Sequence, residues 1–185
     1  MASLKKAAKL GNWTPDGRAE RAAARRDFRE LTPPQRVEQV FELSRFVSQL
    51  ANAGSANEVP ALDIQAILRE LVEVEVEFLL IGGIAVGYHG HIRATKDVDV
   101  VPAPDGQNLE RLAGVLELTP GRLNVVQRAG DLHLWEELSP RALQDSVADL
   151  PIKIVSYDDL VRLKELAGRP EDLVDLQRLR EARES

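Results

Sequence analysis

The chain has no cysteine among its 185 residues. Disulfide frameworks, thiolate zinc sites and cysteine nucleophiles are therefore excluded. Histidine is also scarce, and none of His89, His91 and His133 lies in a metal-binding helix pattern such as HExxH. We expect any bound metal to be held by oxygen ligands, which suit magnesium, manganese or calcium.

Long hydrophobic runs are missing too. No apolar stretch approaches the roughly 18 residues of a membrane span, and residues 1–9 lack the apolar core of a signal peptide. Hydrophobic residues make up 44% and charged residues 29% of the chain, which is typical of globular proteins. We therefore expect a cytoplasmic protein with a hydrophobic core and no membrane partner.

The net charge of −6 is unevenly distributed along the chain. Residues 1–55 carry a net charge of +4, and the remainder carries −10. A basic arm on an acidic body can contact nucleic acid or an acidic partner protein. Aromatic residues do not alternate with the basic ones as stacking platforms for bases, which favours a solvated basic helix.

Residues 1–55 are predicted to form a basic helical extension, whose weakly patterned first 31 residues we expect to be mobile. From Thr32 the pattern improves, because Thr32, Pro33 and Gln35 are typical of a capping box. Apolar residues then recur at helical spacing up to Gly54, which predicts an amphipathic helix that needs a partner surface. These residues are Val37, Val40, Phe41, Val47, Leu50 and Ala51.

Residues 56–185 are predicted to form the second unit, of α/β class: a small mixed sheet flanked by helices. Apolar periodicity and turn residues divide it into short elements. We expect helices over 62–72, 84–88, 109–118, 158–167 and 170–183, strands over 76–81, 97–101, 122–127 and 151–155, and a strand or turn at 132–134 followed by a short helix.

Glycines and aspartates follow one another at the ends of two of these strands. Gly82-Gly83 comes directly after the first strand, and Asp97 and Asp99 lie on the next. Side chains alternate along a strand, so both carboxylates would point to one face, about 6 to 7 Å apart. The glycines would let a phosphate approach backbone N–H groups, and a magnesium ion would bind both aspartates and bridge the phosphates. Each piece alone is typical of a tight turn or an exposed strand, so the prediction depends on their combination.

The stretch from Phe78 to Asp99 resembles the signature of the polymerase-β-like nucleotidyltransferases, in which a strand and a glycine pair precede Asp-x-Asp. Within that superfamily, His89-Gly90, Arg93 and Thr95-Lys96-Asp97 are similar to the AbiEii-like toxin group and its small bacterial relatives. The stretch from Ser156 to Leu176, with Lys164 and Ala-Gly-Arg-Pro, resembles the end of those domains. The resemblance covers residues 58–182.

The resemblance implies a nucleotidyltransferase fold that transfers a nucleoside monophosphate from an NTP to a hydroxyl of RNA, protein or a small molecule, as in toxin–antitoxin systems. Asp97 and Asp99 would be catalytic and would bind Mg²⁺ or Mn²⁺, while Gly82 and Gly83 would contact the triphosphate. Basic residues would neutralise phosphate charge, because phosphoryl transfer depends on electrostatics. The candidates are Arg93, Lys96, Lys164 and Arg169.

One position departs from the family pattern. The third carboxylate, expected on the next strand, is replaced by Asn124, whose neutral amide is no general base and binds dications less strongly. Asp131 or Glu136 could replace it if the chain folds back. The alternative is therefore a catalytically weak nucleotide-binding, regulatory or partner-binding module of the same fold. Its partner, such as a cognate antitoxin, would dock through residues 1–55.

A third possibility is sequence-independent nucleic-acid binding through the basic arm. The remaining polar and aromatic candidates have structural interpretations. Histidine in a loop is more often satisfied by solvent or backbone, tryptophan more often packs, and acidic residues favour helix starts. These residues are His89, His91, Trp13, Trp135, Glu171, Asp172 and Asp175, of which the last three suit a functional role equally well.

Overall fold

The computed structural model describes residues 30–53, 61–119 and 122–184. Residues 33–185 cluster as one compact unit. The predictions for residues 1–29, Trp13 included, lie outside the described residues. The predicted domain boundary at residue 55 does too, and it stays a prediction.

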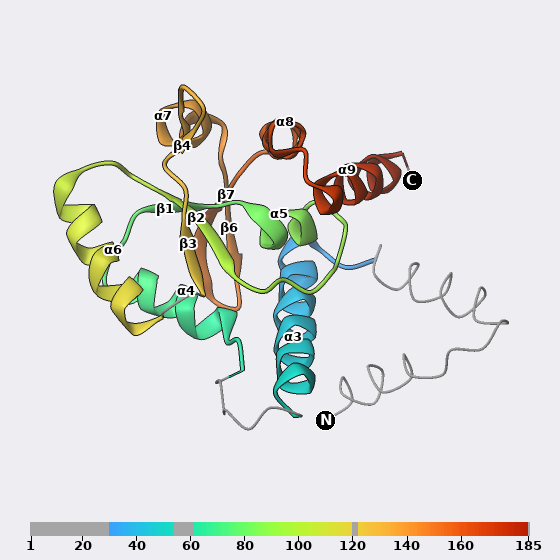
Figure 1. The fold of residues 1–185 in the computed structure, drawn as a ribbon, viewed down its shortest axis with the longest axis horizontal. Helices are drawn as coiled ribbons and strands as arrows, with labels where there is room; N and C mark the ends of the chain where they lie inside the picture. Colours follow the sequence, from blue (N-terminus) through green and yellow to red (C-terminus); the bar gives the residue numbers. More distant parts are fainter. Residues whose placement is uncertain (1–29, 54–60, 120–121, 185) are drawn as a thin grey trace, which may run out of the picture. The chain divides into compact units, whose positions relative to one another are not determined.

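Within the described residues, five strands form one mixed sheet in the order β3-β2-β1-β7-β6 (Figure 1). Central β1 pairs antiparallel with β2 and parallel with β7, while β3 runs parallel to β2 and β6 antiparallel to β7. The strands are β1 (Phe78–Leu80), β2 (Val98–Pro102), β3 (Leu123–Val125), β6 (Leu143–Val147) and β7 (Leu150–Ile154). A separate hairpin joins β4 (Arg128–Ala129) and β5 (Leu132–His133).

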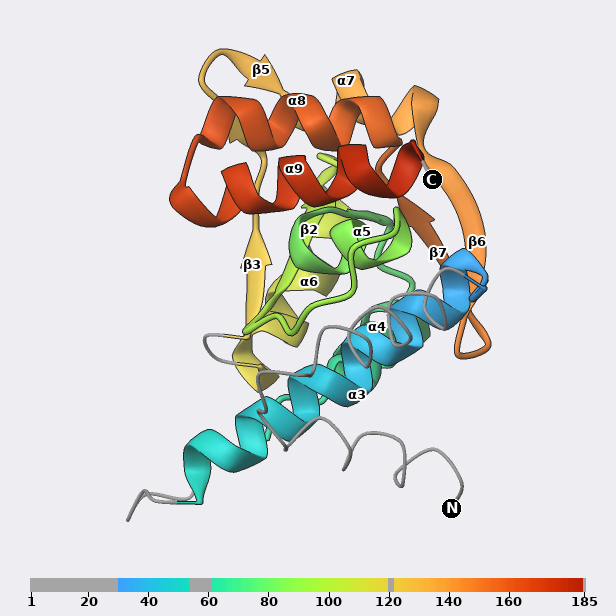
Figure 2. The same ribbon diagram turned by 90° about the vertical axis from the view of Figure 1, so that its right-hand side faces the viewer.

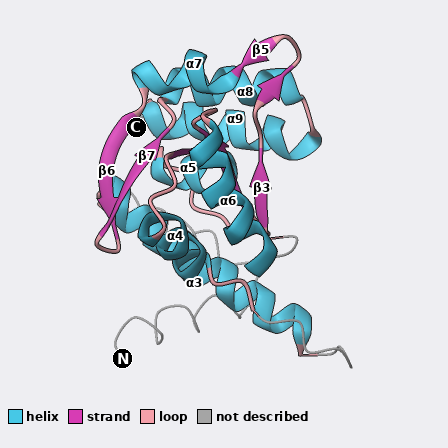
Figure 3. Ribbon diagram, turned by 90° about the vertical axis from the view of Figure 1, so that its left-hand side faces the viewer, coloured by secondary structure: helices cyan, strands magenta, loops and turns pink. Residues whose placement is uncertain are grey.

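Helices flank both faces of the sheet. Two of them, α4 and α6, lie on one face (Figure 3), while α5 and the hairpin of α8 and α9 lie on the other (Figure 2). The helices are α3 (Pro33–Asn52), α4 (Ile64–Glu73), α5 (Gly82–Tyr88), α6 (Gly106–Leu118), α7 (Leu134–Leu138), α8 (Tyr157–Ala167) and α9 (Pro170–Arg183). The predicted α/β class is therefore confirmed.

Local sequence explains where several helices begin. Asp63, Asp105 and Ser156 each precede a helix and accept a hydrogen bond from a backbone N–H of its first turn. These side chains satisfy N–H groups that have no partner inside the helix. At the other end of α8, Gly168 takes the left-handed conformation that ends many helices.

The core follows from the central strands. Leu79 and Leu80 of β1 and Val98, Val100 and Val101 of β2 are all fully buried. Both faces of these strands are covered by helices, so β1 is apolar throughout and β2 is apolar except at Asp99. This rigid sheet centre holds the ends of β1 and β2, where the predicted glycines and aspartates lie.

The sequence patterns miss two features of this fold. First, β6 was not predicted, because its sequence, Leu-Gln-Asp-Ser-Val, is that of a mostly exposed edge strand. Second, only the first half of the apolar face of α3 is buried. Val37, Val40 and Phe41 pack into the core, whereas Val47 and Leu50 are about half exposed. Among the described residues, no helix is both long and apolar enough to cross a bilayer.

Candidate functional site

The candidate site lies at one end of the sheet. Since β1 runs antiparallel to β2, the end of β1 meets the start of β2, and the parallel β3 begins beside it. Gly82 opens α5 directly after β1, Asp97 immediately precedes β2, and Asp99 is its second residue. Asn124 of β3 lies in register with Asp99. The sheet topology therefore brings Gly82 and Asn124, which are 42 positions apart in the sequence, to the same end of the sheet.

The two aspartates converge on one atom. The side-chain nitrogen Nδ2 of Asn124 donates to Asp97 Oδ2 at 2.8 Å and to Asp99 Oδ1 at 3.1 Å. Both carboxylates therefore face the same side, as the strand alternation predicted. Asn124 itself is exposed, so the shared side opens to solvent. The amide bridges two like charges that it does not neutralise.

The glycine pair is built into the packing around these carboxylates. Gly82 has φ of +61°, and a Cβ there would lie 1.9 Å from Asp99 Oδ2. A Cβ on Gly83 would lie 2.8 Å from Thr95 Oγ1. A side chain at either position would displace the residue beside it, so Gly82 and Gly83 let the start of α5 approach Asp99 and Thr95 closely.

The charge of Asp99 is poorly compensated. Burial raises its pKa, and the negative charge of Asp97 raises it further. The hydrogen bond from Asn124 and the positive charges of Lys164 and Arg169 act in the opposite direction without cancelling the increase. A carboxylate in this state gains from a nearby cation.

Two of the predicted phosphate-binding cations are already paired. Arg93 donates from Nε and an Nη atom to both oxygens of Asp175, at 2.7 and 2.8 Å. Lys164 contacts Asp172 at 2.6 Å and Asp175 at 2.9 Å. The side chains of Lys164, Asp172 and Asp175 are at most 6% exposed. We call these residues, together with Arg169, the ion network.

The ion network holds its aspartates charged. Burial alone would raise the pKa of Asp175, but hydrogen bonds from Arg93 and Lys164 outweigh it, and the pKa is lowered. The pKa of Asp172 is likewise lowered, since the bonds from Arg169 and Lys164 exceed the effect of its burial. Arg169 also pairs with Glu171 at 3.5 Å, so three cations match three carboxylates. The network fastens α9 to α8 and to the segment before β2.

The other two predicted cations are accessible. Arg169 is 61% exposed and bonds Asp172 at 2.8 Å while its charge also acts on Asp99. Lys96 is exposed next to Asp97 and forms no ion pair with the described part of the chain. Lys96 therefore remains available to a ligand at the aspartates, whereas Arg169 would share its guanidinium with Asp172 and Glu171.

No third acid joins the pair. Among residues 30–53, 61–119 and 122–184, no group of three His, Asp or Glu side chains could hold a metal ion. Asp131 and Glu136 were the predicted replacements for the third carboxylate. They instead line a separate cavity of about 420 Å³ with Leu132, His133 and Glu137. Asn124 therefore stands where the third carboxylate was expected, without a local replacement.

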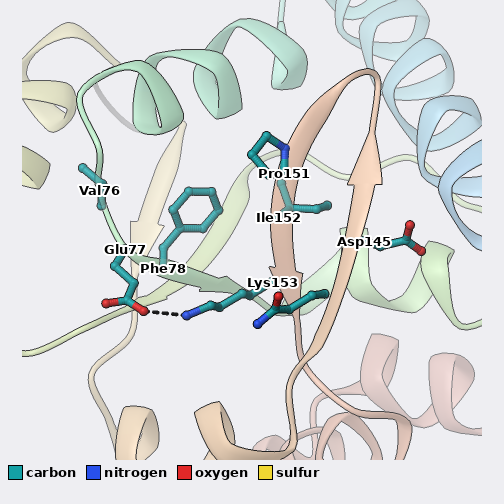
Figure 4. A pocket seen from close by; sticks show the side chains of 8 residues that line it. Val76, Glu77, Phe78, Asp145, Pro151, Ile152 and Lys153 are labelled. Carbon is teal, nitrogen blue, oxygen red and sulfur yellow. Dashed lines mark hydrogen bonds and ion pairs between the residues drawn. The ribbon is translucent and has the colours of Figure 1, made fainter.

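A second cavity, of about 410 Å³, lies between the start of β1 and the β6–β7 hairpin (Figure 4). Val76, Phe78 and Ile152 give it apolar walls, and Lys153 and Glu77, which also line it, form an ion pair at 2.5 Å. None of the predicted site residues lines it, so it is separate from the candidate site.

The structural interpretation of the remaining residues fits their surroundings. His89 Nε2 donates to the Val155 carbonyl at 2.8 Å, and burial lowers its pKa. His91 lies 3.9 Å from Asp175. Trp135 packs against the core and under Lys153. The buried role of Asp172 and Asp175 was not predicted. The signal was their spacing of three residues, which places both on one side of α9.

Comparison with solved structures finds seven similar chains, including the following two. One is an antigenic nucleotidyltransferase-like protein from Paracoccidioides brasiliensis, with 17% identity, a TM-score of 0.48, and coverage of 63% of this chain and 72% of that one. The other is ANT(2")-Ia in complex with adenylyl-2"-tobramycin, with 17% identity, a TM-score of 0.44, and coverage of 63% and 84%. No protein-family model and no curated protein sequence matches this chain. Superpositions this loose carry no functional argument, so the interpretation of the site depends on its own geometry.

Proposed function

We propose that this domain is a metal-dependent nucleotidyltransferase, which transfers a nucleoside monophosphate from an NTP to a hydroxyl acceptor. The supporting observation is the pair of Asp97 and Asp99. Their carboxylates share one side and are bridged by a neutral amide, and that of Asp99 lies against Gly82. Like charges without a counter-ion repel, so the pair does not stabilise the fold. A bound dication would remove this repulsion, and the pair therefore suits a cation site.

The donor set suits magnesium or manganese. Mg²⁺ is commonly bound through one or two carboxylates, with water and substrate phosphates completing its coordination. Asp97 and Asp99 supply two carboxylates at a solvent-facing site, which fits a cation that arrives with an NTP. When bound, the cation would polarise phosphoryl oxygens as a Lewis acid.

The chain's own residues have separate roles in this proposal. Gly82 and Gly83 let the start of α5 pack directly against Asp99 and Thr95. Backbone N–H groups at the start of α5 would then lie near phosphates bound at the aspartates. Arg169 and Lys96, which are exposed near the pair, contribute positive charge to the phosphates. Arg93 and Lys164 hold α9 and α8 beside the site, and the charge of Lys164 also acts on Asp99.

The acceptor and the biological setting are extensions of the same proposal. RNA, protein and small-molecule hydroxyls are all compatible with an open site. The resemblance to AbiEii-like toxins adds a toxin–antitoxin role, with an antitoxin or other partner bound through residues 1–55. The proposed site of action is the cytoplasm.

A second candidate function has its own observation. Asn124 already donates to both carboxylates and offers no base for the acceptor hydroxyl. A module that binds an NTP and a dication for regulation or partner binding, with little turnover, would have this arrangement. Binding without transfer is its distinguishing property.

Labelled NTPs incubated with the protein, Mg²⁺ and total RNA or cell lysate test the first function. We expect label transfer by the wild type and none by Asp97→Ala plus Asp99→Ala. The matched control, Glu73→Ala plus Glu117→Ala, removes two exposed carboxylates from α4 and α6 and should transfer label normally. Equal labelling by all three proteins would overturn the proposal.

Calorimetry separates the two functions. If the wild type binds an NTP with Mn²⁺ but transfers no label, the binding module is favoured. Asn124→Asp should then raise transfer sharply if only the third carboxylate is missing. The absence of binding to every NTP would contradict both functions.

A further inference from the structure

An irregular connection leads to the first catalytic aspartate. Residues 89–97 join α5 to β2 without helix or strand and end at Asp97. Their backbone conformation is therefore not fixed by a ladder of hydrogen bonds, and other elements must hold it. Contacts from His89 to Val155 and from Arg93 to Asp175 fasten its beginning and middle.

The last part of this connection is held by α3. Thr95 donates its backbone N–H to Ser44 Oγ at 2.9 Å, and both residues are buried, at 8% and 1% exposure. A buried N–H needs an acceptor, and the hydroxyl of Ser44 supplies it. Ser44 is the polar member of the buried side of α3, beside Val37, Val40 and Phe41.

This contact belongs to a stripe along α3. Residues four apart lie on one side of a helix. Arg36 donates to the Tyr88 carbonyl at 3.3 Å, and Val40 packs so closely on Gly87 that a Cβ there would lie 2.4 Å from its methyl carbon. Ser44 is the third member. The stripe therefore follows the chain from the end of α5 towards Asp97.

Thr95 passes this contact on to the site. Its hydroxyl lies 3.2 Å from the Asp97 carbonyl and 3.4 Å from Asp97 Oδ1. The same hydroxyl lies closest to the position that a Cβ on Gly83 would take. Thr95 thus lies between Ser44, the carboxylate of Asp97 and the glycine pair.

We propose that Ser44 is a positioning residue of the site: from α3 it fixes Thr95, and through Thr95 it sets the position of the Asp97 carboxylate beside Asp99. The role in nucleotide binding rests on the proposed function. In this proposal α3, which lies outside the part of the chain that resembles nucleotidyltransferases, helps to position a residue of the site.

The same helix offers a matched control. Ser48, one turn beyond Ser44, accepts a backbone N–H from Leu62 at 3.0 Å. Ser48→Ala therefore removes the same kind of hydrogen bond, from the same helix, at a segment that does not lead to Asp97. Ser44→Thr retains a hydroxyl and serves as the conservative variant.

Two readouts test the proposal. With Mn²⁺ and a nonhydrolysable NTP, calorimetry should give an affinity about tenfold lower for Ser44→Ala, the size expected for one lost hydrogen bond at a site. Ser48→Ala should bind as the wild type does, and Ser44→Thr should recover most of the affinity. Without nucleotide, the ¹³C chemical shift of the Asp97 carboxyl should move in Ser44→Ala and not in Ser48→Ala.

Equal loss of affinity in Ser44→Ala and Ser48→Ala would overturn the positioning role, since it would reflect stability alone. An Asp97 carboxyl shift that does not respond to Ser44→Ala would overturn it as well. If the wild type binds no metal and nucleotide, the proposed function fails, and the carboxyl shift still decides whether Ser44 positions Asp97.

Discussion

Two pairs of aspartates in this domain have opposite surroundings. Asp172 and Asp175 on α9 are buried and contact Arg93, Lys164 and Arg169. Asp97 and Asp99 at the sheet end share a single neutral partner, the amide of Asn124. The pKa of each α9 aspartate is lowered, whereas that of Asp99 is raised.

This difference separates a structural role from a chemical one. Where each carboxylate contacts a cation, the charges cross-link α8, α9 and the segment before β2. Where carboxylates lack a cation, folding gains nothing from their charge, and the site gains from a cation supplied in solution. Arg169 connects the two regions, because it bonds Asp172 and acts on Asp99 at the same time.

The largest expected effect comes from removing one aspartate of the α9 pair, and the same change in the other pair provides the comparison. Asp175→Asn leaves Arg93 and Lys164 short of a partner, and we expect a loss of about 3 to 5 kcal/mol in the free energy of unfolding, measured in urea. Asp99→Asn should change the same quantity by less than about 1 kcal/mol. Equal losses in the two variants would show that the pairs do not differ as described.

Acid should act on the α9 pair and on Asp99 with opposite signs. The lowered pKa values of Asp172 and Asp175 mean that their contribution to stability is complete above the ordinary aspartate pKa of about 3.9 and is lost as the pH falls through their folded values. The raised pKa of Asp99 means that its ionisation opposes folding, so stability increases as the pH falls through that value.

Urea unfolding across this range checks the signs. We expect Asp99→Asn to lack the increase on approaching about pH 4 while keeping the loss at lower pH, at most about 1.4 kcal/mol per pH unit for each proton taken up. An unchanged profile in Asp99→Asn would contradict the raised pKa.

A third carboxylate should make the stability of the candidate site depend more strongly on a bound metal ion. Asn124→Asp places three acids together, and we expect it to lower the free energy of unfolding by about 1 kcal/mol in the absence of metal. Mn²⁺ alone should then raise its melting temperature, because the folded state binds the ion. Gln127→Glu adds the same charge on a nearby exposed residue and should show no response to Mn²⁺.

The smallest effect on stability is expected at the residue between the pairs. Arg169→Ala should cost less than about 1 kcal/mol, since the side chain is exposed and Lys164 still pairs Asp172. It should weaken NTP binding in calorimetry. Arg180→Ala, which removes an exposed cation paired with Glu165, should leave NTP affinity unchanged. Equal NTP affinities of the two variants would show that Arg169 does not contribute to NTP binding.

Local patterns were sufficient for the central strands and the carboxylate pair. Apolar runs define β1 and β2, and strand alternation places Asp97 and Asp99 on one side. The roles of Ser44 and Asp175 could not be derived in this way, because their partners lie 51 and 82 residues away along the chain. Ser44 did carry a signal: it is a polar residue four positions after Val40 on a predicted apolar face.

The central claim is that Asp97 and Asp99, and not the α9 pair, hold a dication together with a nucleotide. Paramagnetic broadening of NMR signals by Mn²⁺ and a nonhydrolysable NTP tests it directly. We predict that the signals of Gly82, Asp97, Asp99 and Asn124 broaden at the lowest metal concentration, and that those of Asp172 and Asp175 broaden only at higher concentrations. Broadening that begins at the α9 pair or at Asp131 and Glu136, or no broadening at all, would contradict the account.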